Sequence, residues 1–150
     1  MPSFKIGNVE IKNGLVLAPM AGITDKSFRT LAREFGAGFT VSEMISAKGV
    51  YYKDKKTAQL SEFSKEEEPI AIQLFGSEPE ILAKAAAMVA EKYNPEFLDI
   101  NMGCPFPMQV KKGRGAGLLP KTDLVREICD FINAKTNLDF SIKMRLGSEN

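Results

Sequence analysis

The sequence predicts an α/β fold with a mainly parallel sheet. Short apolar runs alternate along the chain with longer segments of helical periodicity, an order typical of repeated βαβ units. The apolar runs lie at residues 15–20, 39–44, 69–75, 97–102 and 140–146. They begin about 31 residues apart on average, and eight such units would make roughly the 250 residues of a TIM barrel. The chain holds about four and a half units, so the spacing fits either the first part of such a barrel or a smaller open α/β sheet.

Three segments between the runs have the apolar spacing of amphipathic helices: 27–36, 78–93 and 121–136. We expect Ser77 and Thr122 to be N-caps, Pro79 to occupy an early helical position, and Gly36 to end the first helix. Residues 47–68 are less regular and predict a short helix followed by a charged loop. The acidic run at 66–68 within this segment is interpreted as a solvated face.

Composition excludes several classes of protein. The 20 Lys and Arg residues nearly balance the 19 Asp and Glu residues, so overall charge indicates neither a nucleic acid nor a membrane partner. The chain has no histidine, which excludes Ser-His-Asp triads and Cys/His nucleophile pairs within it, and its two cysteines, Cys104 and Cys129, form no zinc motif. No apolar run is long enough to span a membrane and the opening residues lack a signal core, so a cytoplasmic protein with no metal and no membrane partner is expected.

Each predicted strand ends in residues that are unusual for a core. These are the segments 19–22, 43–44, 73–76, 101–105 and 143–145. The carboxyl ends of parallel strands meet at one edge of a barrel, where active sites lie. The pattern therefore predicts a catalytic site at that edge.

The same segments resemble the tRNA-dihydrouridine synthases, and in particular their bacterial branch. The matching motifs occur in the family order and are APMAGITD (18–25), SEM (42–44), QLFG (73–76), DINMGCP (99–105), GAGLL (115–119) and KMR (143–145). The resemblance implies a TIM (β/α)8 barrel of which residues 1–150 form the amino-terminal part. It also implies an enzyme that uses FMN and NADPH to reduce specific uridines of tRNA to 5,6-dihydrouridine.

The resemblance further implies a flavin site. Pro19, Met20 and Ala21 would present backbone and apolar surface to the flavin ring. Gln73 would bind the polar edge of the ring, because an amide supplies both a donor and an acceptor. Lys143 would place a positive charge beside the pyrimidine end and stabilise the reduced flavin.

The substrate residues are implied in the same way. Asn101 and Arg145 would face the uracil, and the target base would have to leave its stack to reach them. Cys104 would be the general acid that delivers a proton to carbon 5 while a hydride from flavin reaches carbon 6. An ordinary thiol has a pKa of about 8.5 and is mostly protonated at neutral pH. Cys129 lies in an apolar helical face and is interpreted as a core residue.

One stretch of the chain is locally basic. Lys111, Lys112, Arg114 and Lys121 follow one another with no acidic residue between them, so this loop is a candidate for contact with RNA phosphates, and a plain solvated loop is the alternative.

Two other functions stay open at this point. One is a flavin-dependent oxidoreductase of free pyrimidines, similar to dihydroorotate dehydrogenase, and the other is a non-catalytic half-barrel that assembles with itself or a partner. The resemblance places the FMN phosphate site and an active-site histidine beyond the fifth strand. We therefore expect this chain alone to be inactive, to bind FMN weakly or not at all, and to self-associate through exposed half-barrel surfaces.

Overall fold

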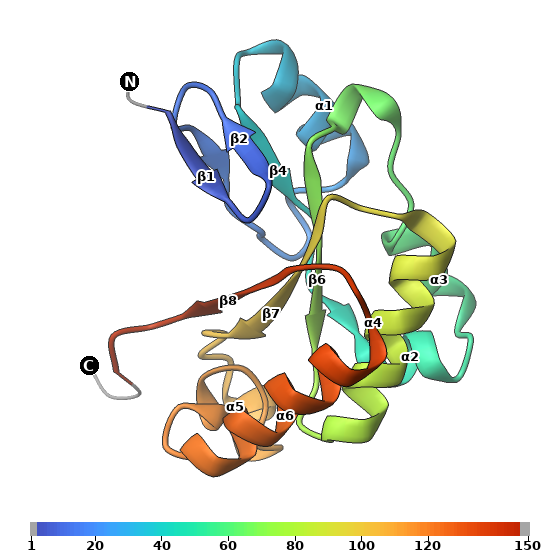
Figure 1. Cartoon of the computed structure of the whole chain (residues 1–150), viewed down its shortest axis with the longest axis vertical. Coiled ribbons are helices and arrows are strands. Elements are labelled where there is room, and N and C mark those ends of the chain that lie inside the picture. The colour runs from blue at the N-terminus through green and yellow to red at the C-terminus, as the bar shows by residue number, and fades with distance from the viewer. Residues whose placement is uncertain (1–2, 148–150) are drawn as a thin grey trace.

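The computed structural model describes residues 3–147; Asn150, at the end of the sequence, lies outside the described part. Its main feature is a parallel sheet that curls into part of a barrel (Figure 1). The strands of this sheet are β3 (Val16–Leu17), β4 (Phe39–Val41), β5 (Ile45–Ser46), β6 (Ile70–Phe75), β7 (Phe97–Met102) and β8 (Phe140–Met144). Each predicted apolar run contains at least one of them.

The order of the strands decides between the two predicted architectures. Strands β3, β4, β6, β7 and β8 lie side by side in chain order, all parallel, and the short β5 pairs with the end of β6. A doubly wound open sheet would reverse its strand order at a switch point. Sequential parallel strands are instead the arrangement of a TIM barrel. The α/β prediction is confirmed, and the structure is a partial barrel.

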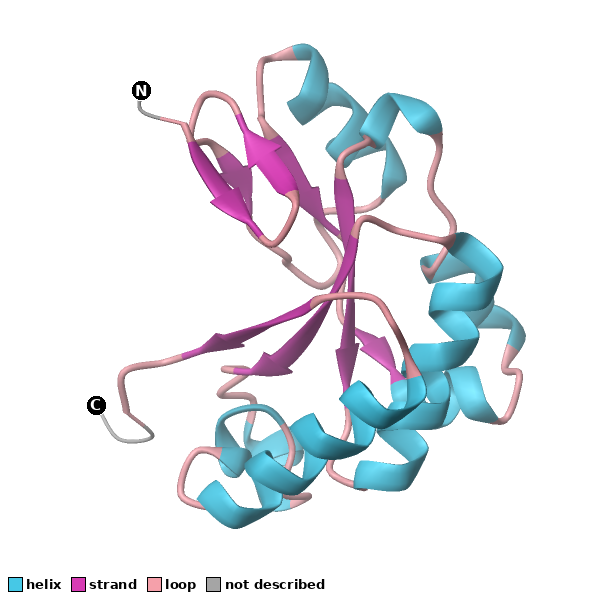
Figure 2. Cartoon of the chain, in the orientation of Figure 1, coloured by secondary structure: helices cyan, strands magenta, loops and turns pink. Residues whose placement is uncertain are grey.

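The long helices cover the convex side of the sheet (Figure 2). The helices are α1 (Lys26–Glu34), α2 (Ala47–Tyr51), α3 (Lys55–Leu60), α4 (Pro79–Tyr93), α5 (Pro107–Lys111) and α6 (Thr122–Lys135), with 3-10 helices η1 (Lys65–Glu67) and η2 (Gly115–Leu118). Helix α4 packs between α2 and α6. None of the helices within residues 3–147 is long and apolar enough to cross a membrane.

The three predicted long helices are confirmed, but two of their predicted caps are wrong. Gly36 follows the end of α1 with a φ of 93°, as expected of a helix stop, and Pro79 is the first residue of α4. Ser77 and Thr122 are not N-caps. Glu78 holds that position before α4, because Pro79 begins the helix, and Lys121 holds it before α6, where a turn closes from Lys121 N to Leu118 O at 2.8 Å.

The irregular segment 47–68 is more helical than predicted. It holds α2, α3 and η1 in place of one short helix and a loop. The side chain of Ser46 caps α2 by accepting from the Gly49 N–H, and Asp54 caps α3 by accepting from the Thr57 N–H at 2.9 Å. These caps satisfy helix-end donors that short helices leave free.

Strands β3 and β4 are much shorter than the apolar runs that contain them. Strand β3 ends at Leu17, and Pro19, two residues further on, has no N–H group with which to continue the ladder. The chain turns instead, with the N–H groups of Ile23 and Thr24 both donating to Met20 O at 3.0 Å. Strand β4 ends at Val41, where the hydroxyl of Ser42 begins to take part in hydrogen bonding.

An antiparallel hairpin that the apolar runs do not predict closes one end of the barrel interior. Strands β1 (Phe4–Ile6) and β2 (Val9–Ile11) pair around a turn at Gly7 and Asn8, where Gly7 has a φ of 54°. Ile11 is fully buried against Phe39 and Phe97, whose rings stack at 4.7 Å. The amino-terminal end of the interior is therefore apolar and filled.

The concave face of the sheet changes from apolar to polar toward the carboxyl ends of its strands. The ladder registers place three inward rows across the strands, and successive rows contain Val41, Ala71 and Phe97, then Gln73, Asp99 and Ser141, then Asn101 and Lys143. The alternate residues of β6 and β7 face the helices and form the main core with α4 and α6. The fold thus gathers polar side chains at one end of the interior.

Candidate active site

A cavity of about 350 Å³ opens at this polar end. It is lined by Pro19, Met20, Ala21, Met44, Gln73, Asn101, Gly103, Cys104, Pro105, Lys143 and Arg145. All eight site residues expected from the sequence are in this set, although they come from four separate parts of the chain. The structure therefore brings the predicted residues together, while their individual roles remain predictions.

The wall formed by residues 19–21 is a rigid turn. The N–H of Met20 does not join the sheet and donates instead to the Thr24 hydroxyl at 2.9 Å. Gly22 has a φ of 77°, which favours glycine, and its N–H donates to the carboxylate of Glu43. Glu43 is 8% exposed and was not predicted as a site residue. It holds the turn against the strand end that carries Met44.

A buried ion pair fixes the same turn from behind. Arg29 on α1 donates through Nε to Glu67 at 2.6 Å and through Nη1 to Thr24 O at 2.9 Å. The Arg29 and Glu67 side chains are only 2% and 0% exposed. The interpretation of residues 66–68 as a solvated face is therefore wrong for Glu67, which must be buried to satisfy the arginine.

The floor of the cavity is a row of hydrogen-bonded side chains. Gln73 Nε2 donates to Asp99 Oδ2 at 2.6 Å, and Ser141 Oγ donates to Asp99 Oδ1 at 2.5 Å. Burial raises the pKa of Asp99, while the bonds from Gln73 and Ser141 and the charge of Lys143 oppose that rise. Neither Asp99 nor Ser141 was predicted as a site residue, although both lie next to predicted ones by strand alternation.

Asn101 connects this floor to the segment that carries the thiol. Its Nδ2 donates to Gln73 Oε1 at 2.9 Å, and its Oδ1 accepts from the N–H groups of Gly103 at 3.3 Å and Cys104 at 3.0 Å. Asn101 therefore acts on its own chain as well as facing the cavity. The half-buried Cys104 is held in place by an amide that is itself held by the floor.

The other side of the Cys104 segment rests on η2. Ala116 N donates to Cys104 O at 2.9 Å. Gly115 has a φ of 55°, and a Cβ added there would lie 2.6 Å from Cys104 O. The GAGLL motif thus places a glycine where only a hydrogen fits. Cys129 lies on α6, away from the residues that line the cavity, and burial raises the pKa of its thiol.

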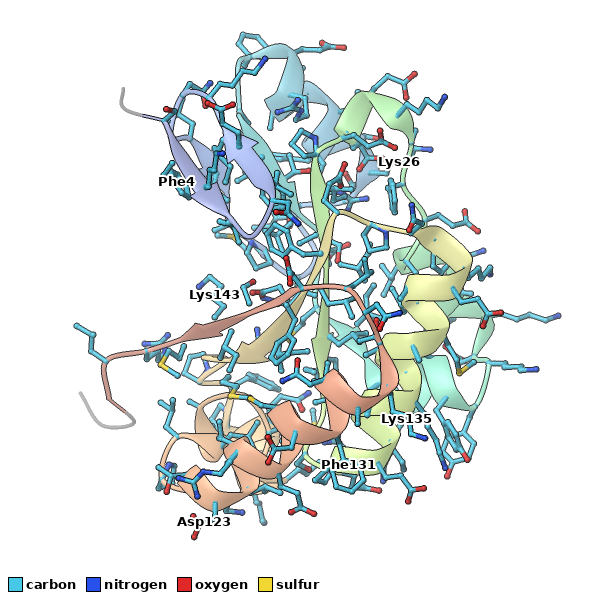
Figure 3. The ribbon with its side chains drawn as sticks, in the orientation of Figure 1. Phe4, Lys26, Asp123, Phe131, Lys135 and Lys143 are labelled. Carbon is cyan, nitrogen blue, oxygen red and sulfur yellow. The ribbon has the colours of Figure 1, made fainter. Side chains whose placement is uncertain are left out.

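Two cationic side chains close the cavity on the β8 side. Lys143 is exposed and extends from β8 toward the open concave side of the sheet, away from α6 (Figure 3). Arg145 follows the strand and donates through Nε to Gly103 O at 2.7 Å. This contact leaves the two terminal nitrogens of Arg145 at the cavity rim.

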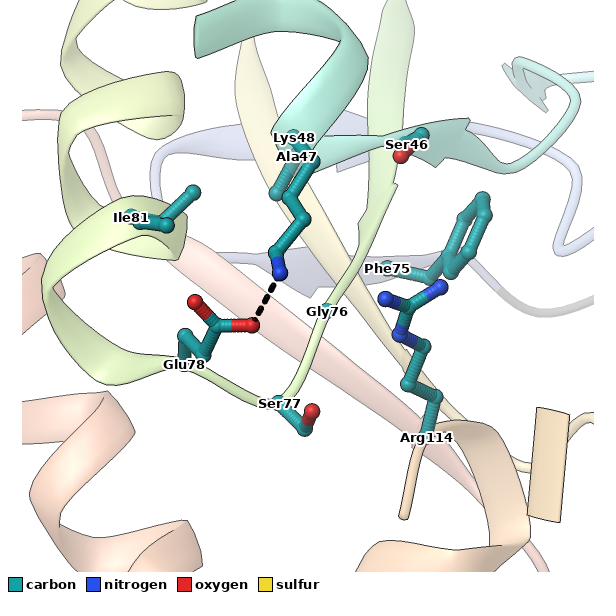
Figure 4. Close-up of a pocket in the computed structure, with 9 residues that line it drawn as sticks. All are labelled: Ser46, Ala47, Lys48, Phe75, Gly76, Ser77, Glu78, Ile81 and Arg114. Atoms are coloured by element: carbon teal, nitrogen blue, oxygen red, sulfur yellow. Dashed lines mark ion pairs between the residues drawn. The ribbon is translucent and has the colours of Figure 1, made fainter. Parts of the chain in front are cut away.

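The basic stretch divides into two parts. Lys111, Lys112 and Lys121 are exposed, whereas Arg114 turns back over the ring of Phe75 at 6.0 Å (Figure 4). There it lines a small hollow next to the ion pair of Lys48 and Glu78, whose charged atoms are 2.5 Å apart. Only the lysines project into solvent. No group of three His, Cys, Asp or Glu side chains within residues 3–147 could hold a metal ion.

Comparisons of the chain with a family model and with known proteins agree on one family. Residues 16–150 match the family model described as dihydrouridine synthase (Dus). The chain is 38% identical over 143 residues to tRNA-dihydrouridine synthase B of Vibrio cholerae, a match that covers 95% of this chain and 44% of that protein. It is 37% identical over 145 residues to the protein of the same name from Shewanella oneidensis, covering 97% and 45%. The Pseudomonas aeruginosa protein of that name is 37% identical over 147 residues, covering 98% and 44%. The chain spans less than half the length of these relatives.

Proposed function

The chain belongs to the dihydrouridine synthase family, and from that premise we propose that it is the amino-terminal part of an enzyme that reduces uridines of tRNA to 5,6-dihydrouridine. FMN is the proposed cofactor and NADPH the proposed electron source. Transfer RNA is a cytoplasmic substrate, and the cytoplasm is the compartment we propose. The observation that carries the proposal is the convergence of eight residues from separate strand ends on one cavity.

The residues of the cavity fit a flavin ring. The turn at 19–21 offers an apolar ledge, and Gln73 at the floor keeps one amide hydrogen that is not used by Asp99. Lys143 adds a positive charge to the same wall. A ring that is apolar on its faces and polar at one edge needs these three features. When bound there, FMN would supply the hydride.

The substrate side of the cavity fits a uracil. Asn101 uses one amide hydrogen on Gln73, so its second is free for a carbonyl of the base. Arg145 keeps its two terminal nitrogens for the base or for a nearby phosphate, because only Nε is held by Gly103. The exposed lysines of the basic stretch, Lys111, Lys112 and Lys121, favour a nucleic acid over a free pyrimidine.

Cys104 is the proposed general acid. Its backbone is held by Asn101 on one side and by Ala116 on the other, so the thiol has a defined position at the cavity. The Sγ proton would pass to carbon 5 of the base, and the resulting thiolate would be reprotonated from solvent. A positioned general acid typically contributes roughly 100- to 10,000-fold to a rate.

The test compares two cysteines in the complete enzyme that carries this chain. We expect Cys104→Ala to lose about 100-fold or more of its dihydrouridine formation on tRNA and to keep its flavin absorbance. Cys129→Ala is the matched control and should retain both, because Cys129 lies outside the cavity. Wild-type turnover by the Cys104→Ala variant, or equal turnover on free uridine and on tRNA, would contradict the proposal.

A further inference from the structure

We infer that Asp99 is a positioning residue: through Gln73 it sets the orientation of the Asn101 amide and so the place of the Cys104 thiol. The inference rests on the proposed function only where it concerns proton delivery by Cys104. The orientation itself is a property of three side chains and two backbone N–H groups on β6, β7 and the segment after β7.

The hydrogen bonds form one continuous series from Asp99 to the backbone of Cys104. Asp99 Oδ2 accepts from Gln73 Nε2 at 2.6 Å, and Gln73 Oε1 accepts from Asn101 Nδ2 at 2.9 Å. Asn101 Oδ1 then accepts from the N–H groups of Gly103 and Cys104 at 3.3 and 3.0 Å. Gln73, Asp99 and Asn101 are 1%, 5% and 8% exposed, so little water reaches the bonds between them.

The two ends of this series of hydrogen bonds fix which group donates and which accepts at each step. An ionised carboxylate can only accept hydrogen bonds, and a backbone N–H can only donate. Gln73 must therefore turn its NH2 group toward Asp99, which leaves its oxygen toward Asn101. Asn101 must turn its NH2 group toward that oxygen, which leaves its own oxygen toward Gly103 and Cys104. Reversing either amide would bring two donors or two acceptors face to face.

The carboxylate is supported at its buried position by its neighbours. Ser141 donates to its other oxygen at 2.5 Å, and Lys143 lies one row further along the same face of β8. Ladder pairing aligns these groups, because Asp99 is opposite Gln73 on one side and opposite Ser141 on the other. This hydrogen-bonded arrangement therefore depends on the register of three strands and does not require a bound group.

The experiment measures how fast iodoacetamide alkylates Cys104 in the full chain, across a range of pH, by mass spectrometry of its peptide. Cys129 in the same digest is the internal reference. Asp99→Leu keeps the branched shape of the side chain but removes the acceptor, so Gln73 loses one of its two bonds and only the Gly103 and Cys104 N–H groups still orient the Asn101 amide. We expect the Cys104 rate to rise about tenfold, the scale of one or two lost hydrogen bonds, while Cys129 does not change.

A compensating variant separates orientation from packing. The double change Asp99→Asn with Gln73→Glu moves the acceptor-only group from β7 to the neighbouring position on β6. The carboxylate at position 73 would still accept from the Asn101 NH2 group, so the Asn101 oxygen would keep its direction. We expect the Cys104 rate and pH profile of the double variant to return to within about twofold of the native protein.

Three results would overturn the inference: a native Cys104 rate in Asp99→Leu, a Cys104 rate in the double variant that matches Asp99→Leu, or a double variant that does not fold. If Asp99→Leu itself does not fold, a folded double variant with the native rate supports the inference. The assay needs neither tRNA nor turnover, so failure of the proposed enzymatic function leaves its result unchanged.

Discussion

Replacing Gly115 by alanine should destabilise the protein by straining the backbone at position 115 and, to a larger extent, by displacing the Cys104 segment. An alanine forced into the left-handed region at a φ of 55° costs about 1–2 kcal/mol. Its Cβ would also lie 2.6 Å from Cys104 O and 2.9 Å from Cys104 Cβ, about 0.8 Å short of ordinary contact at the first atom. Relief of such overpacking costs a further 1–3 kcal/mol, roughly, so the total loss of unfolding free energy should be about 2–5 kcal/mol.

Gly113 provides the control, because it shares the backbone strain but not the contact. Its φ is 68°, and an added Cβ would meet only the end of the Lys121 side chain at 3.1 Å. Gly113→Ala should therefore lose only about 1–2 kcal/mol. Urea unfolding followed by circular dichroism measures both variants, and alkylation of Cys104 reports on the segment. Equal losses in the two variants, with unchanged alkylation, would refute the reasoning.

Three further outcomes are expected. Arg29→Met should lower the unfolding free energy by about 3–5 kcal/mol in urea unfolding, because it leaves the Glu67 carboxylate buried without its cationic partner; a loss below 1 kcal/mol, roughly, would contradict this. Burial raises the pKa of Asp99, so folding favours its protonated form. The contribution of Asp99 to the unfolding free energy is therefore present below pH 3.8, its ordinary pKa, and is lost as the pH rises through the raised pKa. Asp99→Asn should remove that part of the pH dependence, and unfolding measured at about pH 4 and pH 7 shows whether it does. The chain alone should bind FMN weakly and self-associate, and light scattering together with a visible spectrum checks both; a yellow monomer would be the contrary result.

The repeated units of the fold could be predicted because each strand is a continuous buried apolar run, as in β6 and β7. The apolar runs do not predict the hairpin, although the sequence carries a signal for it. Gly7 and Asn8 between two short apolar pairs form a two-residue turn typical of hairpins. The apolar runs extend beyond the strands where a side chain takes one of the ladder bonds, as Ser42 Oγ does by accepting from Gln73 N–H, because apolar periodicity does not report such bonds.

The cavity residues could be predicted because strand ends of one barrel edge converge whatever the details of packing. Convergence of strand ends does not predict that Asp99 and Ser141 belong to the cavity floor. Alternation along β7 puts Asp99 on the same face as Asn101, but its pairing with Gln73 and Ser141 depends on the register of strands that lie far apart in sequence. The burial of Glu67 similarly depends on α1 approaching η1, which local composition does not indicate.

The chain-order pairing of the sheet bears on how the molecule acquires its structure. Because β4 adds to β3, β6 to β4, and β7 to β6, each new unit docks on one that has already left the ribosome. The loops to be closed at each step are single βα units, so the entropy of closure is lost in small steps. Folding in the direction of synthesis would thus build the floor of the cavity, from Gln73 to Asn101, before β8 delivers Ser141 to complete the partners of Asp99.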